Sequence, residues 1–159
     1  MAIEEVKKYL FARGIRPEQI KEFDVSSATV ALAAEALGVD GARIAKTLSF
    51  LVDGGAVLVV AAGDARIDNP KFKAAFGTKA KMLSPEQAEE LVGHRVGGVC
   101  PFAVKDGCRI YLDVSLKRFD VVYPAAGSAN SAVEMTLSEL ERCTDFLGWV
   151  DVCKLPAAE

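Results

Sequence analysis

The spacing of apolar residues predicts two amphipathic helices in the first forty residues. The first begins near the N-terminus and stops at Gly14, and the second covers Thr29–Leu37 and ends at Gly38, since glycine is favoured just after a helix. Their apolar positions, three or four residues apart, are Ile3, Val6 and Leu10 in the first helix and Val30, Ala33, Ala34 and Leu37 in the second. Each helix therefore has one face to bury.

The most continuous apolar pattern predicts a β-hairpin. The runs "KTLSFLV" and "AVLVVAAG" flank the turn "DGG", a strong hairpin signature. The second run is apolar at both odd and even positions, so we expect a central strand covered on both faces.

Capping residues predict the later helices. The helix starts are Asp68 with Pro70, Ser84-Pro85-Glu86-Gln87 and Thr136 with Glu139; Gly77 and Gly93 end the first two, and Asp40 caps a further short helix. Between them "IKEFD", "CRIYLD", "FDVVY", "AVEM" and "WVDVC" have the composition of short strands. The mixture lacks a regular βαβ rhythm. We therefore predict one compact domain over residues 1–159, of the α+β or mixed-sheet α/β class, with a mostly antiparallel twisted sheet or partial barrel flanked by helices.

Composition and charge narrow the class of protein. The chain is 51% hydrophobic and 26% charged, which is ordinary for a globular domain. Its longest apolar run, Ala56 to Ala62, is too short to cross a membrane, and "MAIEEVKKYL" does not resemble a signal peptide, so we expect a cytoplasmic protein. The net charge of −3 argues against binding along duplex DNA, although not against binding one small end of a nucleic acid.

Cysteine and histidine usage argues against metal chemistry. The four cysteines, Cys100, Cys108, Cys143 and Cys153, include no C-x-x-C pair, so free thiols are expected. A single histidine, His94, excludes a multi-histidine zinc site. No cofactor is predicted.

Lys46, in "RIAKTLSF", has two interpretations. It is either a lysine whose stem packs on apolar surface near a helix end, or a lysine at the start of a strand that projects into a cleft and binds phosphate or carboxylate.

The stretch "RVGGVCPF" also has two interpretations. Gly97 and Gly98 would let backbone N–H groups converge on an oxygen, with Pro101 fixing the exit from the loop, or the loop is simply a tight turn. Cys100 as a nucleophile would need His94 as its base, and nothing in the spacing marks that pair.

Two further polar positions follow. Gly127, Ser128 and Asn130 form a loop that either binds a small ligand or is an ordinary turn. Asp113 either orients a ligand amine or hydroxyl, or caps the turn at Ser115.

The order of these motifs is more specific than any one of them. "SSAT", "AAEALGV", "RIAKTLSF", "VAAGDARID", "NPKF", "VGHRVGGVCPF", "IYLDVSL" and "AAGSANSAVEM" occur in this sequence along the chain. Together they resemble the YbaK/prolyl-tRNA-synthetase-associated domain family, over about Ser26 to Val152. The resemblance implies a mixed α/β domain that hydrolyses mischarged aminoacyl-tRNA, most often tRNA for proline carrying a small wrong amino acid, as a free-standing enzyme acting in trans.

The resemblance also assigns roles to residues. Lys46 corresponds to the family lysine that engages the terminal adenosine and its phosphate, and residues 97–101 correspond to the G-x-x-x-P loop that holds the aminoacyl carbonyl through its backbone. Gly127 and Ser128 correspond to a pocket wall. The implied partners are the acceptor end of aminoacyl-tRNA and prolyl-tRNA synthetase.

The chain departs from the commonest family pattern at this loop. Many relatives have serine or proline in place of Cys100 and glycine in place of Ala103, so Cys100 is expected to tune the amino-acid pocket. Two other functions stay open at this point: a module of the same fold that binds aminoacyl-tRNA ends without hydrolysis, and thiol redox chemistry at Cys100.

Overall fold

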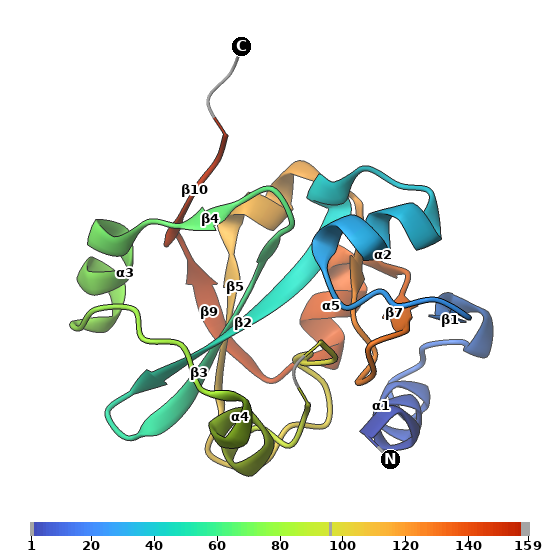
Figure 1. Cartoon of the computed structure of the whole chain (residues 1–159), viewed down its shortest axis with the longest axis horizontal. Coiled ribbons are helices and arrows are strands. Elements are labelled where there is room, and N and C mark those ends of the chain that lie inside the picture. Colours follow the sequence, from blue (N-terminus) through green and yellow to red (C-terminus); the bar gives the residue numbers. More distant parts are fainter. Residues whose placement is uncertain (1, 96, 157–159) are drawn as a thin grey trace.

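A computed structural model describes residues 2–95 and 97–156 and shows a curled six-stranded mixed sheet with helices around it (Figure 1). The strand order is β8-β6-β2-β3-β5-β9. These strands are β2 Ile44–Val52, β3 Gly55–Ala62, β5 Arg109–Asp113, β6 Val121–Pro124, β8 Met135–Thr136 and β9 Phe146–Val150. Two small antiparallel pairs complete the strands, β1 Ile20–Glu22 with β7 Ser131–Val133, and β4 Arg66–Ile67 with β10 Cys153–Lys154.

The hairpin β2–β3 is the centre of the sheet, as the sequence predicts. The two strands pair in register from Ala45 opposite Ala62 to Val52 opposite Gly55. Asp53 and Gly54 both have positive φ (51° and 77°), which is the backbone of the type I′ turn that hairpins favour. From Ala56 to Ala62 every residue of β3 is buried, confirming a strand covered on both faces.

The predicted helices form, and those with a predicted cap begin at it; Thr29, expected as the first residue of its helix, is instead the cap of that helix. The helices are α1 Ala2–Phe11, α2 Val30–Leu37, α3 Asn69–Phe76, α4 Pro85–Leu91 and α5 Leu137–Cys143, with short 3₁₀ helices η1 Pro17–Gln19, η2 Gly41–Arg43 and η3 Val114–Arg118. Side chains of Thr29, Asp40, Asp68, Ser84 and Thr136 each accept a backbone N–H at the start of the helix that follows. In Figure 1, α3 lies to the left of the β2–β3 hairpin, and α2 and α5 lie to its right.

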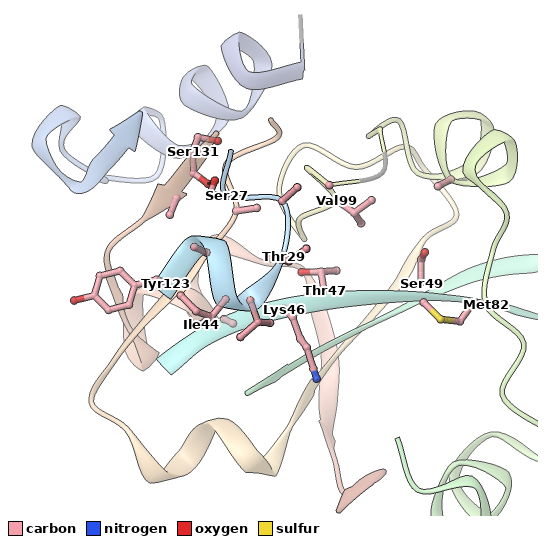
Figure 2. A pocket seen from close by; sticks show the side chains of 18 of the residues that line it. Ser27, Thr29, Ile44, Lys46, Thr47, Ser49, Met82, Val99, Tyr123 and Ser131 are labelled. Atoms are coloured by element: carbon pink, nitrogen blue, oxygen red, sulfur yellow. The ribbon is translucent and has the colours of Figure 1, made fainter. Parts of the chain in front are cut away.

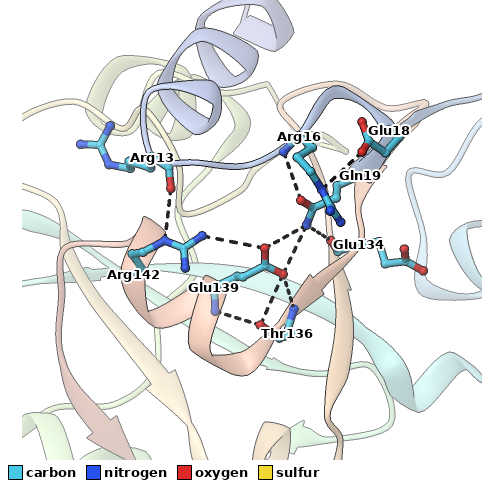
Figure 3. Close-up of polar contacts among 8 residues, drawn as sticks. All are labelled: Arg13, Arg16, Glu18, Gln19, Glu134, Thr136, Glu139 and Arg142. Carbon is cyan, nitrogen blue, oxygen red and sulfur yellow. Dashed lines mark hydrogen bonds and ion pairs between the residues drawn. The ribbon is translucent and has the colours of Figure 1, made fainter.

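The N-terminal segment is attached to the rest of the domain through Gln19 (Figure 3). This buried amide donates to the backbone carbonyl of Glu134 at 2.9 Å and to the Glu139 carboxylate at 3.1 Å, and its own oxygen accepts the N–H of Arg16. Desolvation opposes ionisation of Glu139, but the Thr136 backbone N–H and the Gln19 amide lower its pKa overall. The segment that precedes β1 is therefore part of the same folded unit.

Two strand expectations need correction. "AVEM" is not one strand but two, because Ala132 and Val133 pair with β1 whereas Met135 pairs with β6. "WVDVC" is likewise divided between the end of β9 and the start of β10, and β9 begins earlier, at Phe146. The sheet is mixed, as predicted: four of the seven strand pairings among the described residues are antiparallel, and three, β2–β6, β3–β5 and β5–β9, are parallel.

All four cysteines are free, as expected. Among residues 2–95 and 97–156, no helix is both long and apolar enough to span a bilayer.

Candidate functional site

A cleft of about 410 Å³ opens on one side of β2 (Figure 2). Its walls come from five segments distant in sequence: the start of α2, β2 itself, the residues entering α4, the glycine loop, and β6 with β7. The lining is mainly apolar, with a few hydroxyl groups from Ser27, Thr29, Thr47, Ser49, Tyr123 and Ser131. An apolar hollow with few polar groups is the usual form of a small-ligand site.

The structure brings together the two polar loops that the sequence singles out. A Cβ on Gly98 would lie 2.8 Å from both Cα and N of Ser128 and 2.9 Å from the carbonyl carbon of Gly127, so the two backbones touch. Gly97 lines the cleft with φ of +91° and lies close to Ala28 and Ala129. The N–H of Gly98 already donates to the carbonyl of Arg95 at 3.0 Å, which fixes this turn.

The loop beyond these glycines turns into the core. Cys100 and Phe102 are fully buried, and neither lines the cleft; Val99 does. Pro101 is buried too, beside a separate hollow near Tyr9. Ala103 has φ of +51°, a left-handed conformation that glycine adopts more readily than alanine.

Cys100 and His94 are neighbours without forming a catalytic pair. The Cys100 Sγ lies 3.5 Å from His94 Nε2, but Nε2 is also 2.8 Å from the Phe102 carbonyl, which can only accept, so Nε2 carries a proton. That nitrogen cannot also accept the thiol proton. Burial raises the pKa of Cys100 to about 12. A neutral buried thiol is a poor nucleophile, which argues against thiol chemistry at this position.

The buried imidazole predicts a pH dependence of stability. Burial lowers the pKa of His94 below its ordinary 6.5, so below that pH the unfolded chain binds a proton that the native protein does not. The free energy of unfolding should then fall as the pH drops below 6.5, by at most about 1.4 kcal/mol per pH unit from this group. Urea unfolding at pH 7.5 and 5.5 should show a smaller fall for His94→Gln than for the wild type; an equal fall would exclude this assignment.

Lys46 lies at the third position of β2, and its amine points away from Thr47 (Figure 2). Successive side chains of a strand point to opposite faces, so Thr47 and Ser49 face the cleft whereas the Lys46 stem leaves it at one end. The Nζ donates to the carbonyls of Gly63 and Ala65. Lys46 thus lies near the start of β2 and is among the residues that line the cleft.

The charge of Lys46 has no carboxylate partner in the described part of the chain. Asp64, the nearby acid, is paired with the two terminal guanidinium nitrogens, Nη1 and Nη2, of Arg118. Burial lowers the pKa of Lys46, which means that the half-buried ammonium is incompletely solvated. An anion that binds here would therefore contact an ammonium whose charge no carboxylate among the described residues neutralises.

Thr47 supplies an unpaired polar atom at the cleft. Its Oγ1 is buried and has no hydrogen-bond partner within residues 2–95 and 97–156. Most buried hydroxyls in proteins are paired, so an unpaired one on the wall of a cleft invites a functional explanation. Nothing in the sequence marks Thr47 as a site residue, although its position next to Lys46 in a strand predicts that the two side chains point to opposite faces.

The other predicted site residues lie around the cleft rather than in it. Asp113 is buried and accepts the N–H groups of Ser115 and Val152 at 2.9 Å each, which confirms the turn-capping alternative. Ser128 Oγ lies 2.7 Å from Ser131 Oγ, and Ser131 lines the cleft. Gly127 touches the glycine loop from behind. Met82, which no sequence motif marks, also lines the cleft and is 58% exposed.

Comparison with known proteins identifies a protein family whose profile matches most of the chain. The sequence profile of the aminoacyl-tRNA editing domain matches residues 24–143. "Uncharacterized protein YwhH" of Bacillus subtilis (strain 168) is 51% identical over 97% of this chain and 98% of its own length. Proline–tRNA ligase of Lactiplantibacillus plantarum is 28% identical over 75% of the chain, which spans about a fifth (21%) of that much longer enzyme.

Solved structures agree with these sequence relationships. A crystal structure of "hypothetical protein APE2540" is 31% identical, with a TM-score of 0.83 over 94% of this chain and 99% of that one. A structure described as "a putative trans-editing enzyme for prolyl tRNA synthetase" is 28% identical, with a TM-score of 0.85 over 96% and 97%.

Proposed function

The chain belongs to the aminoacyl-tRNA editing domain family, and from this premise we propose that it hydrolyses the ester of mischarged aminoacyl-tRNA in trans. The substrate of this proposal is tRNA for proline carrying a small wrong amino acid. The observation that carries it is the contact of the two glycine-containing loops at the wall of a mainly apolar cleft. Relatives that are proline–tRNA ligases support the choice of tRNA.

In this proposal the glycine loop supports the reacting carbonyl. Water adds to the ester carbon, the bond to the ribose oxygen breaks, and a proton passes to that oxygen, which leaves the free amino acid and an intact tRNA end. The backbone N–H groups of Gly97 and Val99, the two residues of this loop that line the cleft, are the candidate donors to the developing oxyanion. The ribose hydroxyl or the amino acid itself is the proposed source of water activation.

Lys46 is the proposed contact for the terminal phosphate of the tRNA. Its uncompensated ammonium would gain an anionic partner when the substrate binds, and the pKa of Lys46 would rise toward its ordinary value. The Gly63 and Ala65 carbonyls hold the amine at the edge of the cleft until then. Lys46 would therefore position the substrate and neutralise charge rather than carry a proton.

Thr47 is proposed to orient the aminoacyl group through its hydroxyl. Thr47→Val keeps the shape of the side chain but removes the unpaired oxygen, so we expect kcat/KM for deacylation to fall about 10-fold. The same change should leave Tm unchanged or raise it, because a buried unpaired hydroxyl destabilises the folded state. Thr47→Ser should retain most of the activity. Loss of activity in both variants together with a lower Tm would instead indicate a packing role.

The substrate is tested by charging tRNA for proline with alanine, cysteine, serine and proline in parallel. The proposal predicts rapid release of at least one wrong amino acid and little release of proline. Equal release of all four would contradict selective editing. Prolyl-tRNA synthetase, the proposed partner, is expected to recharge the released tRNA.

A further inference from the structure

The most basic stretch of the chain borders the mouth of the cleft. From Asn69 to Pro85 there are four lysines and no acidic residue, although the whole chain has 22 acidic residues against 19 basic ones. The four, which we call the lysine segment, are Lys71, Lys73, Lys79 and Lys81, and all are exposed. Lys71 pairs with Asp151; the other three form no ion pair within the described residues.

The C-terminal end of the lysine segment has a fixed place beside β2. The carbonyl of Lys81 accepts the N–H of Leu51 at 2.8 Å, and the N–H of Leu83 donates to the carbonyl of Ser49 at 3.0 Å. These bonds, with the bridge between Phe50 and Met82, make residues 81–83 a short extension of the sheet edge. Figure 1 shows this stretch passing the β2–β3 hairpin on its way to α4.

The position of Met82 links these charges to the cleft. Met82 lines the cleft and directly follows Lys81, so the cationic surface begins where the apolar lining ends. On the other side of Met82 the charge changes sign, because α4 has Glu86, Glu89 and Glu90. A polyanion leaving the cleft is therefore attracted toward the lysines and repelled from α4.

We infer that Lys79 and Lys81, with Lys73 of α3, form the surface that binds the phosphodiester backbone of the nucleic acid strand whose 3′ end enters the cleft. This inference rests on the proposed function for the identity of the strand, and it adds the path that the strand follows. Contacts of lysine with phosphate release bound counterions, so they make affinity depend on salt. A surface with few such contacts suits a protein of net charge −3, which binds the end of the nucleic acid and not its length.

The test compares two charge reversals of equal size at different places. Lys79→Glu with Lys81→Glu changes the lysine segment, and Lys8→Glu with Lys117→Glu changes exposed lysines on α1 and η3 by the same net charge. Binding of uncharged tRNA for proline is measured by fluorescence anisotropy from 50 to 200 mM salt. We expect the first pair to weaken binding at least about 10-fold and to lower the salt slope by about two, and the control pair to have less than about a threefold effect.

A second substrate separates this inference from the proposed function. Alanyl-adenosine presents the ester without the phosphodiester chain, so the lysine variants should hydrolyse it at the wild-type rate. One outcome is that the wild type hydrolyses neither substrate while the Lys79→Glu, Lys81→Glu variant still loses tRNA binding. That result would support the lysine surface and contradict the proposed hydrolysis. Equal losses in both pairs, or no loss in the first, would overturn the surface. Lys79→Gln with Lys81→Gln, expected to lose about half as much binding free energy, replaces the glutamate pair if that pair does not fold.

Discussion

Lys46→Ala is expected to reduce deacylation of mischarged tRNA by about 100-fold, the size of effect that follows when a positioning contact is lost. The physical reason is the half-buried ammonium, which has no carboxylate partner in the described residues and is available to a phosphate. The free energy of unfolding should fall by about 1 to 3 kcal/mol, because the lost amine leaves the carbonyls of half-buried Gly63 and buried Ala65 without this donor.

The measurement is single-turnover deacylation together with a thermal melt of each variant. Lys46→Met keeps most of the stem and should lose as much activity as Lys46→Ala, and Lys8→Ala on α1 is the matched control with no expected effect. A Lys46→Ala protein that is unfolded at the assay temperature would show that the lysine is chiefly structural. Full activity in a folded Lys46→Ala protein would remove Lys46 from the site.

Gly98→Ala is expected to have the largest effect on stability. Its Cβ would lie 2.8 Å from two backbone atoms of Ser128, closer than side-chain carbons approach backbone, and neither partner is the end of a flexible side chain. Overpacking of this kind costs about 3 kcal/mol, which corresponds to roughly 6 to 12 °C in Tm for a chain of this length. The loops at 97–98 and 127–128 would separate, so activity should fall as well.

Gly148→Ala is the matched control for this substitution. Gly148 lies in β9, its added Cβ would meet nothing within 4 Å, and its φ is outside the left-handed region, so alanine there should be nearly neutral. Denaturant unfolding of both variants gives the comparison. A Gly98→Ala protein as stable as Gly148→Ala would mean that the two loops are not in contact in solution.

The sequence predicts most of the fold because its local signals agree with one another. The turn at Asp53-Gly54 and the capping boxes at Ser84 and Thr136 depend on neighbouring residues alone, and each is found where expected. The strand errors arise from pairing at long range. Whether Glu134 continues a strand depends on β1 and β6, which are distant in sequence.

The sequence predicts those parts of the site that depend on backbone contacts. It does not predict the parts that depend on the direction of a side chain. Gly98 and Gly127 were singled out as loop glycines, and the structure brings them together. The motif positions of Lys46 and Cys100 do not reveal that strand alternation places the lysine amine at the edge of the cleft or that burial places the thiol in the core. Thr47 was passed over because its unpaired hydroxyl is visible only once its neighbours are known.

Release of the free amino acid under single-turnover conditions tests the central claim most directly. With wild-type protein in excess over tRNA for proline charged with alanine, cysteine or serine, we predict first-order release of at least one amino acid, well above the rate without protein. Saturable binding of all three with no release above that background would contradict a hydrolase and identify the protein as a module that binds aminoacyl-tRNA ends.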